Sequence, residues 1–286
     1  YAPADTHFGL AGLKQLSGKE LSYNNLLDLD AAVRIAGLIQ NSGAAVIKHT
    51  NPCGAASAVT VSEALEAAMA ADPISAFGSI VAVNGIFDIA AAECLLKPGM
   101  FVEVIAAPAF TAEAVEALQT RPAWKASVRL VEVPPGDPWA PTAGLELRSV
   151  AGAMLAQQPD ETPDDPATWQ VVTKQAPAKN LTHPLDFAFT MVRRLTSNAI
   201  AICQGTSLVG AGVGQTSRVD AVRIALEKAG DRARGSVLAS DAFFPFPDSI
   251  ELIQQAGVAA IIQPGGSKRD AEVIAAANAA KIPMVF

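Results

Sequence analysis

The sequence predicts an α/β protein, and three observations carry this prediction. Short apolar runs alternate with helical patterns along almost the whole chain. The apolar runs are continuous, which is typical of strands buried on both faces of a sheet. Half of the 286 residues are hydrophobic, enough to fill one large or two ordinary cores. We therefore expect sheets that are covered by helices on both faces.

The individual elements follow from the same patterns. Nine apolar runs are predicted as strands: residues 45–48, 79–83, 102–106, 128–133, 199–203, 208–212, 237–240, 259–263 and 284–286. Seven segments between them are predicted as helices: residues 62–71, 89–97, 111–118, 184–196, 217–229, 248–256 and 268–280. Ser62 and Thr111 are the expected N-caps of two of these helices.

A proline-rich segment divides the chain. Residues 133–144 contain four prolines, which exclude both a helix and a central strand. This segment predicts a boundary between two domains, residues 1–143 and 144–286. A second loop at residues 158–169, rich in Pro and Asp, is a weaker candidate boundary.

Composition limits the possible functions. The formal net charge of −7 argues against general nucleic-acid binding, which needs a basic surface. No apolar run approaches the roughly 20 residues that span a bilayer, so we expect no membrane partner. The three cysteines, Cys53, Cys94 and Cys203, form no C-x-x-C pair. A reduced, cytoplasmic location is expected.

The first candidate site is Lys48 and His49, where a strand ends in a tight turn. If the two side chains share a small volume, the ammonium disfavours a protonated imidazole. His49 would then be neutral near pH 7 and able to accept a proton. The alternative is a solvated Lys-His pair at the end of a strand.

The same turn argues against zinc. Zinc deaminases need H-x-E and P-C-x-x-C. Pro52-Cys53 matches part of this signature, but position 56 is Ala56 and the residue two after His49 is Asn51. No zinc site is expected, and no pattern supports Cys53 as a nucleophile.

A glycine-rich segment, residues 210–218, lies between a predicted strand and helix. It is similar to a dinucleotide fingerprint, but Gln215 replaces the last glycine, which excludes an NAD-dependent oxidoreductase. A ligand site and a plain glycine turn both remain open. Arg218 opposes the helix dipole and so suggests an anionic partner, although exposed Arg residues are common there.

Phenylalanines flank prolines at residues 243–246. Phe243, Phe244 and Phe246 suit a flat ligand ring or ordinary core packing. Residues 263–267 form another potential anion turn between a strand and a helix. Residues 18–25 are a loop or a helix cap.

Eight segments considered together resemble one family. They occur in this order: residues 18–25, 47–54, 72–79, 171–174, 196–200, 210–218, 240–246 and 262–274. They resemble the AICAR transformylase portion of the bifunctional purine biosynthesis proteins, whose other portion is IMP cyclohydrolase. The resemblance covers residues 15–286.

The resemblance implies formyl transfer from 10-formyltetrahydrofolate, the co-substrate, to the 5-amino group of AICAR. It also implies two cytidine-deaminase-like, three-layer α/β domains without zinc, and a homodimer with active sites at the subunit interface. Lys48 and His49 match the family's catalytic pair, and Asn198 matches an active-site Asn near the transferred group. Six residues match substrate-binding positions: Tyr23, Asn24, Asn25, Arg218, Phe243 and Asp248.

The chain departs from the family pattern in several places. An Arg-containing motif expected just before Tyr1, a short Arg- and His-containing tail after Phe286 and the cyclohydrolase portion are absent, and Pro247 replaces an Arg. We therefore expect an excerpt of a longer protein or a truncated form. In a truncated form, a non-catalytic nucleotide- or folate-binding module is the alternative function.

Overall fold

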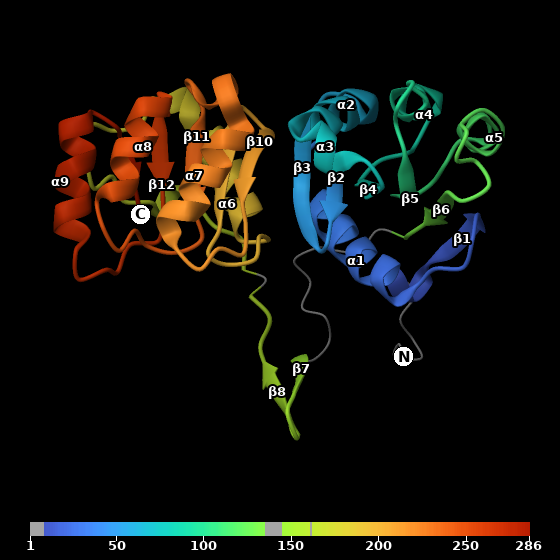
Figure 1. Ribbon diagram of the computed structural model, residues 1–286, viewed down its shortest axis with the longest axis horizontal. Helices are drawn as coiled ribbons and strands as arrows, with labels where there is room; N and C mark the ends of the chain where they lie inside the picture. Colours follow the sequence, from blue (N-terminus) through green and yellow to red (C-terminus); the bar gives the residue numbers. More distant parts are fainter. Residues whose placement is uncertain (1–8, 135–144, 161) are drawn as a thin grey trace.

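The computed structural model describes residues 9–134, 145–160 and 162–286. Within these ranges, eleven strands form one mixed sheet in the order β1-β6-β5-β4-β2-β3-β10-β9-β11-β12-β13. The two halves of the chain lie side by side along this sheet (Figure 1). The predicted α/β class is confirmed.

The two halves repeat one order of elements. The first half runs through α1 (Tyr23–Leu38), β2 (Ser42–Lys48), β3 (Asn51–Ala58), α2 (Val61–Ala71), α3 (Pro73–Ala76), β4 (Ser79–Val83), α4 (Ile89–Leu95), β5 (Val102–Ala107), α5 (Ala112–Thr120) and β6 (Arg129–Glu132). The second runs through α6 (Thr182–Val192), β9 (Ile200–Gln204), β10 (Ser207–Gly212), α7 (Arg218–Ala229), β11 (Val237–Ser240), α8 (Asp248–Ala256), β12 (Ala260–Ile262), α9 (Asp270–Ala280) and β13 (Met284–Val285).

The strand pairing repeats as well. In each half a hairpin (β2–β3, β9–β10) is followed by a strand that pairs antiparallel with the first strand of the hairpin, and by two further parallel strands. The first half also has an edge strand, β1 (Lys14–Ser17), antiparallel to β6. Each half is therefore a copy of the same topology.

Helices cover both faces of the sheet. One core, with α1 and α6 over one face, extends through both halves and includes Leu29, Leu185 and Met191. The other face has separate cores, one beneath α2, α4 and α5 and one beneath α7, α8 and α9. This arrangement gives three layers and explains why the strands read as continuous apolar runs.

The halves meet at a seam, the line where β3 and β10 run antiparallel. Their register contains one pair, Ser207 with Ala56, near the start of β10. Beyond that pair the ladder stops, and Pro52 in β3 has no N–H to donate to it. The strands diverge towards the start of β3.

Close helix packing beside the seam depends on glycines. A Cβ on Gly54 of β3 would lie 1.9 Å from the carbonyl oxygen of Ala68 in α2. A Cβ on Gly212 of β10 would lie 2.0 Å from the carbonyl oxygen of Ala221 in α7. Part of the glycine-rich segment therefore serves helix–strand contact rather than ligand binding.

Strand directions place the sequence motifs at one end of the strands. β2 ends there at Lys48 and β3 begins; β10 ends there at Gly212, β9 begins, and β11 ends at Ser240. We call this the site end of the sheet. The far end holds the β9–β10 turn and the start of α2.

Some expectations need correction. The N-cap of α2 is Thr60, whose side chain accepts from the Glu63 N–H, and not Ser62. The helix predicted at residues 184–196 is α6, which begins and ends earlier, and α9 begins at Asp270 rather than at residue 268. Thr111 does cap α5.

Several elements were not predicted: α1, β1, β3 and a separate hairpin of β7 (Glu146–Val150) and β8 (Ala153–Gln157). Most of the proline-rich segment at residues 133–144, with the boundary at 143/144, lies outside the described residues. Among the helices in the described ranges, none has the length and apolar character needed to cross a membrane.

Candidate active site

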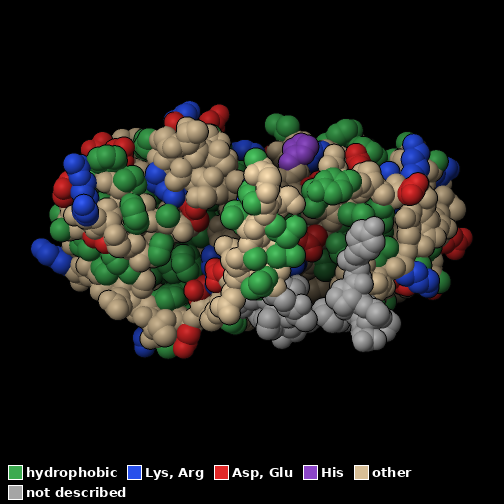
Figure 2. All heavy atoms as spheres, turned by 90° about the horizontal axis from the view of Figure 1, so that it is seen from below, with side chains coloured by type: hydrophobic (Ala, Val, Ile, Leu, Met, Phe, Trp, Pro, Cys, Tyr) green, Lys and Arg blue, Asp and Glu red, His purple; other side chains and the backbone are tan. Residues whose placement is uncertain are grey.

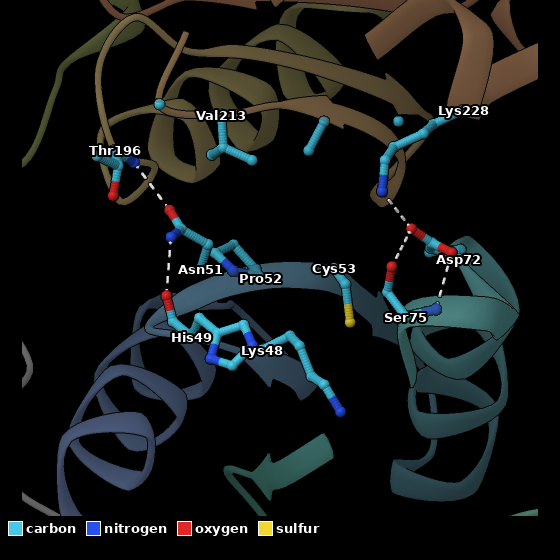
Figure 3. Close-up of a pocket in the computed structure, with 14 residues that line it drawn as sticks. Lys48, His49, Asn51, Pro52, Cys53, Asp72, Ser75, Thr196, Val213 and Lys228 are labelled. Carbon is cyan, nitrogen blue, oxygen red and sulfur yellow. Dashed lines mark hydrogen bonds and ion pairs between the residues drawn. The ribbon is translucent and has the colours of Figure 1, made fainter. Parts of the chain in front are cut away.

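A cavity of about 320 Å³ opens where β3 and β10 diverge at the seam (Figure 3). The turn after β2 forms one part of its wall, with Lys48, His49 and Asn51, and the end of β10 forms another. Thr196, just before β9, also lines it. The volume lies at the lower limit for small-molecule sites, about 300–1,000 Å³.

The turn that carries His49 is held in an uncommon conformation. His49 and Thr50 form a two-residue hairpin loop in which both φ angles are positive, 49° and 63°. This is a type I′ arrangement, normally built from Asn and Gly. The Thr50 N–H donates to the Asp28 carboxylate at 2.6 Å, and the Asn51 side chain donates to the His49 carbonyl at 2.9 Å. The imidazole itself is exposed.

Asn51 connects this turn to the second half of the chain. Its side-chain oxygen accepts from the Thr196 N–H at 2.9 Å, while its side-chain nitrogen binds the His49 carbonyl (Figure 3). One amide side chain thereby fixes the spacing between the β2–β3 turn and the segment that leads to Asn198.

Among the residues that the structure describes, two carbonyls accept hydrogen bonds from the ammonium of Lys48. Its Nζ donates to the carbonyls of Phe77 at 2.6 Å and Gly78 at 2.9 Å, both just before β4. An ammonium has three N–H donors, so one remains for a ligand. Both acceptors are neutral carbonyls, so neither supplies a counter-charge.

A second group of predicted residues surrounds Asn198. The Arg218 guanidinium donates to the Asn198 side-chain oxygen and to the Ala199 carbonyl, both at 2.8 Å. It also forms an ion pair with Asp241, which accepts from the Ala199 N–H at 2.8 Å. The Asn198 side-chain nitrogen donates to the Gln215 carbonyl at 2.8 Å.

This network changes the interpretation of Arg218. The sequence suggested a cation that awaits an anionic partner, but Arg218 is buried and its charge is balanced by Asp241. The role that the structure supports is positioning, because Arg218 sets the orientation of the Asn198 amide. Its Nε is buried and has no hydrogen-bond partner in the described part of the chain.

The phenylalanine cluster divides between core and surface. Phe244 is fully buried in the core of the second half, as the core-packing alternative predicts. Phe243 and Phe246 are exposed, and the Arg269 guanidinium lies 4.8 Å from the centroid of the Phe246 ring. Asp248 is exposed and begins α8. Phe243 thus offers an apolar ring to a ligand near the site end.

The segment at residues 18–25 is a helix cap. Ser22 is the N-cap of α1, in a capping box with Asn25. Asn25 is buried and also donates to the Glu103 carboxylate at 3.3 Å, whereas Tyr23 and Asn24 are exposed. The structure therefore places these three residues together, but only two of them face solvent.

Charges near the middle of the seam tie the halves together. Lys228 of α7 forms an ion pair with Asp72 at 2.5 Å, and Ser75 donates to the same carboxylate (Figure 3). Burial alone would raise the pKa of Asp72, but hydrogen bonds from Lys228 and Ser75 lower it below its usual value. Arg232 donates to the carbonyls of Ala70 and Ala71 at the end of α2.

The thiol in the cavity wall is not activated. Burial, with a smaller contribution from Asp72, raises the pKa of Cys53 to about 12. The thiol is therefore protonated at neutral pH, which agrees with the absence of a nucleophile pattern in the sequence. Among the residues that the structure describes, no group of three or more His, Cys, Asp or Glu side chains could hold a metal ion.

Comparison with known proteins shows the family. The model of the AICARFT/IMPCHase bienzyme matches residues 1–228. The chain belongs to this family.

Three similar relatives are called bifunctional purine biosynthesis protein PurH. The protein of Rhodopirellula baltica is 52% identical over 99% of this chain, that of Desulfitobacterium hafniense (strain DSM 10664 / DCB-2) 47% over 100%, and that of Streptococcus thermophilus 44% over 98%. Each alignment covers 54% of the relative. The chain therefore spans about half the length of the curated relatives it matches, as the resemblance to one portion of these proteins suggested.

Sequence reasoning missed three polar residues of the site. Asn51 was considered only as a mismatch to the zinc signature, Thr196 only as part of a motif, and Asp241 only as a neighbour of the phenylalanines. The available signal was the position of Asp241 directly after a buried strand, where α/β sheets expose functional groups.

Proposed function

We propose that this chain transfers a formyl group from 10-formyltetrahydrofolate to the 5-amino group of AICAR, giving FAICAR and tetrahydrofolate. The observation that carries the proposal is that Lys48 and His49, at the turn between β2 and β3, both line the cavity at the seam. Membership of the bienzyme family and identities of 44–52% to the relatives named above support it.

The reaction makes specific demands on a site. The amine is a poor nucleophile because its lone pair is delocalised into the imidazole ring of AICAR. Attack of the amine forms a C–N bond to the formyl carbon and turns the formyl oxygen into an oxyanion, and collapse of this intermediate breaks the bond between the formyl carbon and N10 of the folate. The amine proton leaves and a proton reaches N10. Alignment, a base and oxyanion stabilisation are all needed.

Three residues would meet these demands. The exposed imidazole of His49 takes the proton from the amine and returns it to N10. The third N–H of Lys48 stabilises the oxyanion or assists the leaving nitrogen, since two others are held by carbonyls. The second N–H of the Asn198 amide orients the formyl oxygen, since Arg218 and Gln215 fix that amide.

The remaining predicted residues would form the substrate pocket. Tyr23, Asn24 and Asn25 lie beside the nucleotide. Phe243 and Asp248 contact the folate, for which an exposed ring at Phe243 gives a stacking surface. Arg218 acts on the same pocket through Asn198. AICAR and the folate are bound without zinc.

We further propose the architecture that the resemblance implies. The domains are residues 1–143 and 144–286, both cytidine-deaminase-like with three layers, and the repeated order of elements supports the division. The chain forms a homodimer with active sites at the subunit interface and works in the cytoplasm. Its acidic charge supports small-molecule partners rather than nucleic acid.

The test is turnover by the purified chain with AICAR and 10-formyltetrahydrofolate, followed by release of tetrahydrofolate. We expect turnover that His49→Ala lowers steeply while AICAR affinity changes little. His183→Ala, the same change at a histidine outside this cavity, is the matched control and should keep full activity. Saturable AICAR binding without turnover would instead identify a binding module.

A further inference from the structure

The two halves are joined differently at the two ends of the seam. Towards the far end, Ser57 and Thr206 exchange two hydrogen bonds, at 2.9 and 3.0 Å, beside the registered pair of β3 and β10. At the site end the strands have diverged, and the hydrogen bond from the Thr196 N–H to the Asn51 side chain crosses the gap at 2.9 Å. There, within the described residues, a side chain takes the place of the strand ladder.

Asn51 also holds the turn that carries the proposed base. Its Nδ2 donates to the His49 carbonyl at 2.9 Å (Figure 3). His49 and Thr50 both have positive φ angles, which L residues other than Asn and Asp rarely adopt, so the turn needs contacts that hold it. The imidazole is exposed, and its place therefore follows from this backbone. Without the Asn51 amide, the turn loses one of these contacts on the side that faces the second half.

The other partner of Asn51 moves together with Asn198. The Gly214 N–H donates to the Thr196 carbonyl at 2.7 Å, and Asn198 and Gln215 exchange backbone hydrogen bonds at 3.2 and 3.3 Å. This short segment before β9 is thereby tied to the end of the glycine-rich segment. A displacement of Thr196 therefore displaces Asn198 as well.

The chemistry of asparagine suits this position. A neutral amide supplies an acceptor for one N–H and a donor for one carbonyl, which neither a carboxylate nor an apolar side chain does. Pro52 follows directly and favours an extended backbone at Asn51, which limits the directions that its side chain takes. The amide is half-buried, so its two hydrogen bonds add little to the stability of the fold. Alignment is the more sensitive quantity, since a displacement of about 1 Å costs about 100-fold in rate.

We propose that Asn51 is a positioning residue for formyl transfer, which fixes the turn with His49 against the segment with Asn198. The inference rests on the proposed function, because Asn51 acts through these two residues and touches no reacting atom itself. Such a role has a kinetic signature. Substrates still bind when the alignment is lost, but the chemical step is slow, so kcat falls while KM stays.

The test is steady-state turnover of Asn51→Ala in the full chain, measured by release of tetrahydrofolate. We expect kcat to fall about 10- to 100-fold, with KM values for AICAR and 10-formyltetrahydrofolate close to those of wild type. An equal loss through general destabilisation is excluded by urea unfolding of the same variant, which should show a folded protein at assay conditions.

Asn84→Ala is the matched control. Asn84 is half-buried as well and lies at the far end, where its side chain accepts from the Gly43 N–H at 2.7 Å. The same amide donates to the carbonyls of Ile39 and Asn41. Its removal should lower the urea midpoint at least as far as Asn51→Ala does, but keep the wild-type kcat. Both changes remove a neutral amide, so the charges spread over both halves stay as they are (Figure 2).

A double variant tests whether Asn51 acts through His49. In a His49→Ala background, Asn51→Ala should lower kcat little further, because a base that is absent cannot be misaligned. Full multiplication of the two effects would overturn the proposal, and so would a wild-type kcat for Asn51→Ala or an equal loss of kcat in Asn84→Ala. A wild-type chain without turnover would overturn the proposed function itself, and the positioning role with it.

Discussion

The two ends of the central sheet are built from equivalent elements but differ in chemistry. At the site end, the first half contributes its hairpin turn, His49–Thr50, and the second half contributes the start of α7 at Arg218. At the far end the roles are reversed. The second half contributes its hairpin turn, Gly205–Thr206, and the first half contributes the start of α2 after Thr60.

At the far end, the β9–β10 turn and the start of α2 follow the local rules of the backbone. Its turn places the positive φ, 58°, on Gly205, where glycine adopts it without strain. Its helix begins with a capping box of Thr60 and Glu63. At the site end, positive φ angles fall on His and Thr, and a buried Arg begins the helix. Departures of this kind persist where function requires them.

The largest expected effect comes from placing glycine at position 49, so that the site-end turn has the same residue at its positive φ as the far-end turn. His49→Gly should lower kcat by about 10²- to 10⁴-fold, because the proposed base is lost. The same change should raise the free energy of unfolding by roughly 1 kcal/mol, because glycine tolerates a φ of 49°. Steady-state kinetics and urea unfolding measure the two effects. An unchanged kcat would remove His49 from the mechanism.

The second effect contrasts the two helix starts. Asp241→Ala should lower the free energy of unfolding by about 3–5 kcal/mol, because it leaves the buried Arg218 guanidinium without its counter-ion. Glu63→Ala in the far-end capping box is the matched change and should cost about 0.5–1 kcal/mol. Urea unfolding compares them. Equal losses would show that the Arg218 network is an ordinary cap.

A smaller effect tests the far-end turn by itself. Gly205→Ala should lower the free energy of unfolding by roughly 1–2 kcal/mol, because the Cβ of alanine is strained at a positive φ. A Cβ there would meet no atom within 4 Å, so the change isolates the backbone conformation. Turnover should stay at the wild-type level. Lost turnover with an intact fold would mean that the far end also takes part in the chemistry.

The smallest effect is a pH dependence at the middle of the seam. Because the pKa of Asp72 is lowered in the folded state, its ion pair stabilises the fold above the unfolded pKa of about 3.9, and this contribution disappears as pH falls through the folded pKa. Lys228→Met should cost about 0.5 kcal/mol at pH 7, since Lys228 is partly exposed, and progressively less as the pH falls below about 3.9. Thermal unfolding of both proteins over a pH series measures this difference in stability. A difference that does not depend on pH would assign the loss to packing of the Lys228 side chain.

The sequence predicted what depends on local pattern. Every apolar run that was predicted as a strand is one, because burial on both faces leaves a continuous pattern. Strand β3 was not predicted because it contains Pro52, Gly54 and several alanines, which have low strand propensity. It is a strand because β2 and β10 pair with it on both sides. That pairing is a tertiary effect that no local window contains.

The candidate site also contains residues that the local sequence pattern predicts and residues whose role depends on tertiary contacts. Lys48 and His49 could be located from the sequence because a strand ends there in a tight turn. The state of Arg218 could not, because its partner Asp241 lies 23 residues later and is brought close by the pairing of β9 with β11. Residues 145–157 show apolar positions but no periodic pattern long enough to predict a hairpin.

The short pairing of β3 with β10 at the seam, and the composition of β3, affect how the chain folds during its synthesis. During synthesis the first half leaves the ribosome first, and domains fold as they emerge. Until β10 arrives, β3 is an open edge that could pair with a strand of another nascent chain. Pro52 removes one donor from that edge, and alanine and glycine give it little side-chain surface to bury. The same composition that leaves the cavity open in the finished protein thus protects the unfinished one from mispairing.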